Sequence, residues 1–197
     1  MNIPVVYEDK DLLVVNKPSG LLTVPTPKNE LRTLTSILGF LPCHRLDRGT
    51  SGLIIYAKNK IARDKVVDLF RRRQVKKTYL AFVNGQLLRK EGLIQRAIEG
   101  KPAETFYRVI EQRNNFSIVE VAPHTGRTNQ IRIHFKTIGH PLLGEDKYAF
   151  RRDFKIKAKR LCLHALAIEF RHPITGKHLK LEAALPQDLK DFLNKNV

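Results

Sequence analysis

The stretch His-Arg-Leu-Asp-Arg-Gly-Thr-Ser-Gly, residues 44–52, runs directly into the apolar segment Leu-Ile-Ile-Tyr-Ala at 53–57. Two glycines, a threonine and a serine close to one acidic residue predict a tight loop that presents polar groups. The apolar segment predicts a buried strand. Asp47 stands between Arg45 and Arg48, and a carboxylate beside guanidinium groups stays ionised, as a nucleophile or general base must. The pattern alone leaves a surface ion pair in a turn as the alternative.

A second polar stretch, Thr-Gly-Arg-Thr-Asn-Gln-Ile-Arg-Ile-His, covers residues 125–134. Apolar and polar residues alternate in it from 130 to 135, which predicts a strand. Its apolar face would hold Ile131, Ile133 and Phe135, and its polar face would hold Gln130, Arg132 and His134. On this interpretation Arg132 lies in mid-strand, where a guanidinium needs an anionic partner. A solvent-exposed strand face is the alternative.

The remaining pattern predicts more strands than helices. Strands are expected over 12–15, 78–83, 116–121 and 161–170, where short runs are apolar, β-branched or aromatic. Helices are expected over 31–38, over 59–73 with Asn59 as N-cap, and from Pro186 to the C-terminus. Because strands and helices do not alternate regularly, we predict an α+β fold with a largely antiparallel mixed sheet and flanking helices.

The charge of the chain indicates a polyanionic partner. Among 197 residues, 36 Lys and Arg stand against 19 Asp and Glu, a formal net charge of +17. Positive residues gather at 71–77 and 151–160, so a surface that follows phosphates is expected. Nucleic acid is the first candidate and an anionic membrane surface the second. Tryptophan is absent and aromatic residues make up 8%, which argues against a broad base-stacking platform.

Several functional classes lack their sequence signals. The chain has no phosphate-loop motif, no dinucleotide-binding glycine motif, and neither C-x-x-C nor H-E-x-x-H. Two cysteines cannot form a disulfide framework, and the N-terminal segment lacks the apolar core of a signal peptide. No apolar run is long enough to span a bilayer. We therefore expect a cytoplasmic protein without a membrane segment.

Residues 44–52 resemble the H-R-L-D-x-x-T-S-G signature of the RluA family of pseudouridine synthases. Four further stretches resemble family elements in the same order along the chain: residues 14–21 (Val-Val-Asn-Lys-Pro-Ser-Gly-Leu), 77–81 (Lys-Thr-Tyr-Leu-Ala), 125–132, and 139–146 together with 163–165. Asn129 stands where the family usually has His. The S4 RNA-binding domain of many relatives is not found, so residues 1–197 are expected to be a single pseudouridine synthase catalytic domain.

The resemblance implies conversion of uridine to pseudouridine in structured RNA, either tRNA, 23S ribosomal RNA or both. It implies the pseudouridine synthase fold with a central catalytic cleft, and it implies no cofactor and no metal. Asp47 would be the catalytic aspartate, through attack on C1′ or removal of the 2′ proton. Tyr79 would lie against the uracil and take the C5 proton, and Arg132 would pair with Asp47. A core strand aromatic is the alternative for Tyr79.

The RNA surface is expected to include both motif residues and residues of the basic stretches. These are His44, Arg45, Arg48, Thr50, Arg71, Arg72, Arg73, Lys76, Lys77, Arg127, Gln130, Arg151 and Arg152. Arg45 would enter the space left by the extracted nucleotide. No obligate protein partner is expected, and the chain is predicted to be a monomer. The alternatives are a non-catalytic RNA-binding or RNA-chaperone protein on the same scaffold, and a glycosidase that excises the base.

Overall fold

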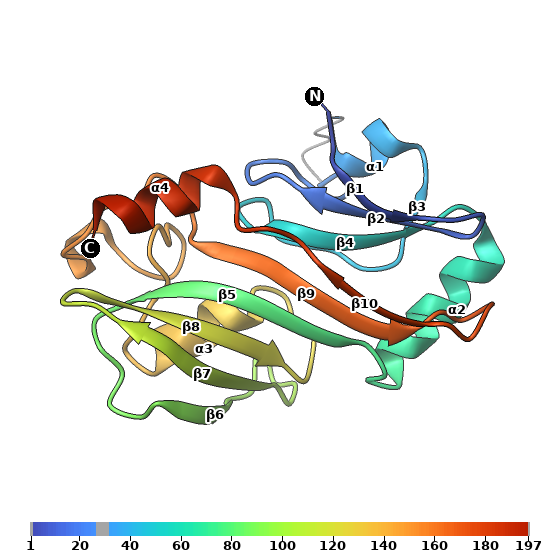
Figure 1. The fold of residues 1–197 in the computed structure, drawn as a ribbon. Helices are drawn as coiled ribbons and strands as arrows, with labels where there is room; N and C mark the ends of the chain where they lie inside the picture. Colours follow the sequence, from blue (N-terminus) through green and yellow to red (C-terminus); the bar gives the residue numbers. More distant parts are fainter. Residues whose placement is uncertain (1, 27–31, 197) are drawn as a thin grey trace. The chain divides into compact units, whose positions relative to one another are not determined.

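The computed structural model describes residues 2–26 and 32–196, the side chain of Arg151 excepted. The chain forms two compact units (Figure 1). The first comprises residues 1–77 and 165–184, and the second comprises 78–164 and 185–197. Two strands, β5 (Lys76–Asn84) and β9 (Leu163–Arg171), have residues in both units.

The strands of the first unit follow the order β1-β2-β4-β9, and β10 pairs with β9. They are β1 (Val5–Glu8), β2 (Leu12–Lys17), β4 (Ser51–Ala57), β9 and β10 (His178–Glu182), and a short β3 (Leu41–Pro42) also pairs with β4. The pairs β1–β2, β2–β4 and β9–β10 are antiparallel. Leu12 pairs with Ala57 and Lys17 pairs with Gly52. The end of β2 therefore lies beside the start of β4.

Helix α2 (Lys60–Arg71) covers one face of this sheet. Asn59 caps it by accepting the backbone N–H of Ala62 through its side chain, as the sequence predicted. Ala62 and Val66 of α2 pack with alternate residues of β2, β4, β9 and β10 in one core. The shorter α1 (Leu34–Leu38) begins at Thr33 and ends at Gly39. Leu31, expected in that helix, lies outside the described residues.

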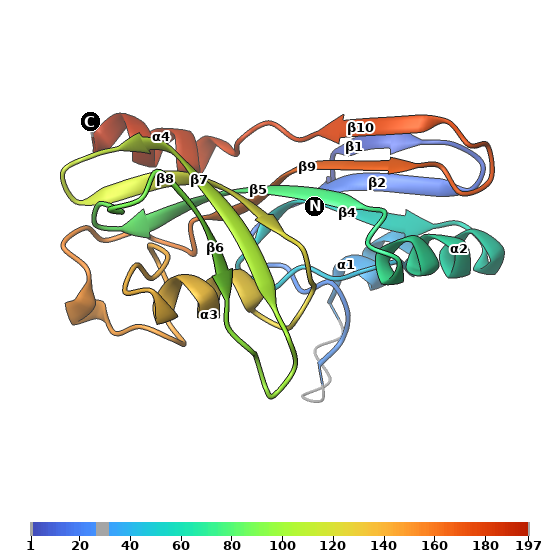
Figure 2. The ribbon, with the colours of Figure 1, turned by 90° about the horizontal axis from the view of Figure 1, so that it is seen from below.

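The second unit has an antiparallel sheet in the order β5-β8-β7-β6. Its further members are β6 (Glu91–Gln95), β7 (Glu104–Gln112) and β8 (Phe116–Pro123). Two helices, α3 (Gln130–Thr137) and α4 (Gln187–Lys195), lie on opposite sides of these strands (Figure 2). A 3₁₀ turn covers Arg151–Asp153.

Strand β5 shows why both faces of this sheet are covered. Ala81 and Val83 pack with Ile131 and Phe135 of α3 on one face. The intervening Phe82 packs on the other face with Phe192 of α4, at 5.9 Å between ring centroids. Because successive side chains of a strand point to opposite faces, an apolar run such as 79–83 needs cover on both sides.

The sequence predicted most of these elements but not all of them. The strands expected at 12–15, 53–57, 78–83, 116–121 and 161–170 are present, as are the α2 and α4 helices. The α+β class with a largely antiparallel sheet is confirmed. Strands β1, β3, β6, β7 and β10 were not predicted. The strand expected at 130–135 is wrong, because these residues form helix α3.

Candidate active site

The loop that carries Asp47 is held by the segment that follows β2. The backbone N–H of Gly20 donates to the carbonyl of Arg48 at 2.8 Å, and the Ser19 hydroxyl donates to the carbonyl of Gly49 at 2.7 Å. The backbone N–H of Thr50 donates back to the carbonyl of Asp47 at 3.1 Å, which closes the turn. The two stretches that resemble family elements at 14–21 and 44–52 are thus one structural feature.

Lys17 is the buried centre of this feature, and no role was predicted for it from the sequence. Its side chain is 0% exposed. Its ammonium donates to the carbonyls of Leu21 at 2.7 Å, Pro18 at 2.9 Å and Arg48 at 3.3 Å. A buried ammonium is costly unless its protons are bonded, and here backbone carbonyls receive them. The sequence offered one signal for this role, which is a lysine at the end of a strand that is otherwise apolar.

Gly52 fixes where this loop meets the sheet. Its φ of +114° lies in a region that favours glycine, and a Cβ there would lie 2.3 Å from the carbonyl oxygen of Ala165 in β9. Any side chain at 52 would force the β4 and β9 backbones apart. The glycine therefore allows the Asp47 loop to lie directly against the sheet.

Tyr79 lies in β5 and pairs with Val121 of β8. It is half-buried and packs at the border of the core formed by β5, β8 and α3. Both interpretations considered for it, a strand aromatic and a ring at the edge of a site, are compatible with this half-buried place.

Arg132 lies in the first turn of α3 rather than in a strand, which corrects the sequence prediction. The buried residues of α3 are Gln130, Ile131, His134 and Phe135, at the spacing of a helix face. Six alternating residues fit a short strand and one side of a helix almost equally well, so the period was misread. The polar face predicted for Gln130, Arg132 and His134 does not exist, because Gln130 and His134 are buried.

The Arg132 guanidinium has an anionic partner, Glu145, that was not predicted from the sequence. Its Nε donates to Oε2 of Glu145 at 2.7 Å and its Nη2 donates to Oε1 at 2.6 Å. This two-pronged pair is nearly enclosed, since the side chains are 11% and 0% exposed. Burial alone would raise the pKa of Glu145, but bonds from Arg132 and from backbone N–H groups outweigh it and hold the pKa below its usual value. The sequence offered one signal for this partner, because Glu145 lies within the stretch 139–146 that resembles a family element.

Most of the residues predicted to contact RNA are exposed cations. In the first unit Arg45, Arg48, Arg71, Arg72, Arg73 and Lys76 are exposed, and in the second unit Arg127 and Arg152 are exposed. Arg71, Arg72 and Arg73 stand at the C-terminal end of α2, where the helix dipole favours positive charge. Arg72 pairs with Asp68 at 2.7 Å and Lys76 with Glu169 at 3.3 Å. These surface pairs leave both cations open to solvent and to phosphate.

Two other predicted RNA contacts, Thr50 and Gln130, are buried in the protein. Thr50 is 2% exposed. The Gln130 side chain accepts from the Thr125 hydroxyl and the Arg127 N–H and donates to the Glu104 carbonyl and the Thr105 hydroxyl. Every hydrogen-bonding site of that amide is therefore used inside the second unit.

His44, another predicted RNA contact, is only partly exposed. Its Nε2 accepts the backbone N–H of Ile55 at 3.0 Å, and its ring lies 4.7 Å from that of Phe70. Burial, with a smaller contribution from the charge of Lys77, lowers the pKa of His44 to about 3. His44 is therefore neutral at pH 7 and ties the loop to β4, rather than offering a cation to phosphate.

Lys77 is a predicted RNA contact with a different charge behaviour from its exposed neighbours. It is only partly exposed, and burial lowers the pKa of its ammonium to about 8. Its positive charge is thus partly lost under mildly alkaline conditions, whereas the arginines of α2 remain charged.

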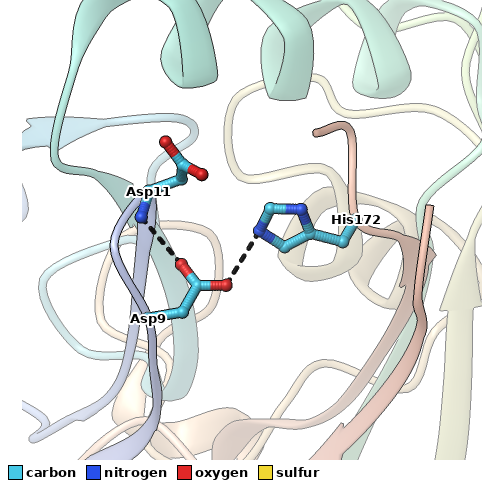
Figure 3. Close-up of side chains that lie close together, drawn as sticks. All are labelled: Asp9, Asp11 and His172. Atoms are coloured by element: carbon cyan, nitrogen blue, oxygen red, sulfur yellow. Dashed lines mark hydrogen bonds and ion pairs between the residues drawn. The ribbon is translucent and has the colours of Figure 1, made fainter. Parts of the chain in front are cut away.

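A cluster of Asp9, Asp11 and His172 has the side-chain types of a metal site (Figure 3). However, Nδ1 of His172 accepts the backbone N–H groups of Ile174 and Thr175 at 3.2 and 3.1 Å. The ring proton must therefore be on Nε2, which lies 3.0 Å from Oδ2 of Asp9 and so has no lone pair for a metal. His172 and Asp9 therefore form a hydrogen-bonded pair, and these residues do not fit a metal site.

Comparisons with known proteins agree with these features. The family model for RNA pseudouridylate synthases matches residues 11–137. The dual-specificity RNA pseudouridine synthase RluA of Yersinia pestis is 40% identical over 91% of this chain and 98% of its own length. The uncharacterised RNA pseudouridine synthase YlyB of Bacillus subtilis is 35% identical over 98% of this chain and 72% of its own.

A solved structure supports the same relationship. Human RNA pseudouridylate synthase domain containing 1 superposes with a TM-score of 0.80 at 29% identity, covering 94% of this chain and 84% of its own. No helix in the described ranges 2–26 and 32–196 combines the length and apolar character needed to cross a bilayer. The chain has the HRLD loop, it matches the family model over residues 11–137, and it shares the fold of a solved relative. It belongs to the RluA family of RNA pseudouridine synthases.

Proposed function

We propose that this chain isomerises specific uridines to pseudouridine in tRNA, in 23S ribosomal RNA or in both. The observation that carries the proposal is the buried Lys17 network around the Asp47 loop, which holds one carboxylate in a defined turn. The names of the relatives support RNA as the substrate: one is a dual-specificity RNA pseudouridine synthase, and others are ribosomal large subunit pseudouridine synthases. The family resemblance adds tRNA to the proposal.

The reaction requires no net redox change and no second substrate. The N1–C1′ bond of the target uridine breaks, the uracil turns, and its C5 bonds to C1′. The proton on C5 is lost and N1 gains one, so atoms and charge balance. Asp47 acts either by attack on C1′ or by removing the 2′ proton, and both routes remain in the proposal.

We assign two other side chains to this reaction from the family resemblance. Tyr79 lies against the uracil and takes the C5 proton, a demanding role for a phenol with an ordinary pKa of about 10. Arg132 pairs with Asp47 and keeps it ionised.

RNA is held mainly through its phosphates in this proposal. The cations at 71–73, 76, 127 and 152 are exposed and suit backbone contacts. Arg45 and Arg48 flank Asp47 and are also exposed, and Arg45 enters the stack when the nucleotide is extracted. We propose that both compact units act as one catalytic domain, as a monomer in the cytoplasm.

The test is a map of pseudouridine in tRNA and ribosomal RNA from cells with and without the gene, followed by the purified protein on the RNA that changes. Asp47→Asn should abolish product formation while RNA binding persists. Asp64→Asn, which removes an exposed carboxylate of α2, is the matched control. No gene-dependent pseudouridine would overturn the proposal. Release of free uracil would point to base excision instead.

A further inference from the structure

The guanidinium of Arg132 is held on three sides by residues of the second unit. Glu145 binds its Nε and Nη2. Asn129 accepts from its Nη1 through Oδ1 at 3.1 Å. The ring of Tyr148 lies under its plane, 5.3 Å from the ring centroid to Cζ. A side chain with several torsions is thereby restricted to one orientation.

Glu145 is itself fixed more firmly than an ordinary ion-pair partner. Its Oε1 accepts the backbone N–H groups of Asp146, Lys147 and Tyr148 at 3.1, 2.8 and 3.1 Å. The turn that provides these donors depends on Gly144, whose φ is +75° and whose Cβ, if present, would lie 1.9 Å from the carbonyl oxygen of Arg160. The carboxylate is therefore positioned by backbone rather than by flexible side chains.

Asn129 fixes the other end of the guanidinium. It has a left-handed φ of 54°, a conformation that asparagine tolerates better than most residues. Its Nδ2 donates to the Tyr148 hydroxyl at 2.8 Å while its Oδ1 accepts from Arg132. One amide thus links the arginine to the aromatic ring beneath it.

We propose that Glu145 is a positioning residue for the isomerisation, assisted by Asn129, and that it acts by fixing the plane of the Arg132 guanidinium. The inference rests on the proposed function, because Arg132 must serve the reaction. A bidentate partner sets both the position and the plane of a guanidinium, whereas a single contact sets neither. Glu145 does not touch the RNA in this proposal.

The neighbouring carboxylate offers a matched control. Asp146 lies 3.4 Å from Nη2 of the same Arg132, but its side chain is 92% exposed. It adds charge near the guanidinium without enclosing it. Glu145→Gln and Asp146→Asn therefore remove equal charge at adjacent positions and differ in geometry.

The experiment measures single-turnover pseudouridine formation, RNA affinity and the Nε–H resonance of Arg132 in each variant. Glu145→Gln should lower the rate at least 10-fold and leave affinity within about 2-fold, because a glutamine NH₂ cannot accept one of the two guanidinium donors. The Nε–H signal should be slow to exchange in the parent and lost in the variant. Asp146→Asn should match the parent in all three.

A double-mutant cycle with Arg132→Lys separates positioning from general stabilisation. If Glu145 acts through Arg132, Glu145→Gln should reduce the rate of Arg132→Lys by less than 3-fold, because the planar geometry is already lost. If Glu145→Gln does not fold, Glu145→Asp takes its place in every measurement. A parent-like rate in the folded variant, or a full additive loss in the cycle, would overturn the inference.

Failure of the proposed function has a different signature. In that case the parent forms no pseudouridine on any RNA tested, and the Nε–H measurement alone decides whether Glu145 fixes Arg132. An active parent with a parent-like Glu145→Gln variant would overturn only the role of Glu145.

Discussion

The Asp47 loop and the Arg132 cradle, defined here as Arg132 with Asn129, Glu145 and Tyr148, hold their reactive groups by different means. The loop is held by backbone carbonyls and N–H groups around the buried ammonium of Lys17. In the cradle, the Arg132 guanidinium is held by side-chain to side-chain bonds, although Glu145 is itself fixed by backbone N–H groups. A backbone-held loop is disrupted by changes in chain conformation, whereas a side-chain cradle is disrupted by changes in charge and geometry.

The largest expected effect is on the loop, from Gly52→Ala. The new Cβ would overlap the Ala165 carbonyl, and the φ of +114° is strained for alanine, so we expect a loss of about 3–5 kcal/mol in unfolding free energy. Gly20→Ala also has a positive φ, of +85°, but its Cβ would meet nothing within 4 Å. It should lose only about 1–2 kcal/mol. Urea denaturation compares the two, and equal losses would show that close packing against β9 is unimportant.

The cradle should respond instead to loss of charge. Arg132→Met leaves the buried Glu145 without its cation, at a cost of about 3 kcal/mol near neutral pH, reduced by the backbone N–H groups that remain. Arg108→Met, which breaks the exposed pair with Glu120, should cost under about 1 kcal/mol.

The pH dependence of this loss provides a second check. In the parent, the lowered pKa of Glu145 contributes stability above its ordinary pKa, and that stability is lost as pH falls. In Arg132→Met, burial raises the pKa of Glu145 instead, so protonation removes the unpaired buried charge and stabilises the variant. The difference in unfolding free energy between the parent and Arg132→Met should therefore become smaller as the pH is lowered from 7 to 4. A constant gap would mean that Glu145 and Arg132 are not coupled.

The two regions also differ in how far the sequence predicted them. The Asp47 loop was predicted because glycine, threonine and serine at 49–52 are local turn signals, and the following buried strand confirmed them. The Arg132 region was misread because a six-residue apolar alternation does not distinguish a strand from a helix. Its partner Glu145 lies 13 residues away in a loop, and no local pattern predicts such a tertiary pair. The role of Lys17 was missed for the same reason.

A smaller effect is expected at the edge of the loop, where His44 is partly buried and neutral at pH 7. Its pKa is about 3 in the folded protein against an ordinary 6.5, so the unfolded chain binds the proton first and stability falls as pH drops below 6.5. Between pH 7 and pH 5 this loss should be about 2 kcal/mol.

Two variants isolate this contribution. His44→Gln can keep an acceptor for the Ile55 N–H but does not titrate, so its stability should depend less on pH over this range. His178→Gln is the control, since His178 is exposed and pairs with the half-buried Glu169. If chemical denaturation shows the same loss of unfolding free energy between pH 7 and pH 5 for the parent and for His44→Gln, the lowered pKa of His44 is refuted.

The smallest expected effects are on RNA affinity. Measuring them shows which of the two units binds the RNA phosphates. Arg71→Gln and Arg73→Gln each remove one exposed charge at the end of α2, and Arg127→Gln and Arg152→Gln do so in the second unit. Each residue that contacts phosphate should reduce the slope of log K against log salt by about 0.7–0.9, for single-stranded or duplex RNA respectively. Arg108→Gln on β7, whose charge is already paired with Glu120, is the control and should leave the slope unchanged.

Because phosphate contacts fix the register of the RNA rather than select a base, these variants should weaken the binding of cognate and non-cognate RNA alike. Loss restricted to the α2 pair would place the phosphate path on the unit that carries Asp47. Equal loss in both pairs would mean that the RNA backbone is held by both units, and an unchanged slope in all four variants would exclude these arginines as phosphate contacts.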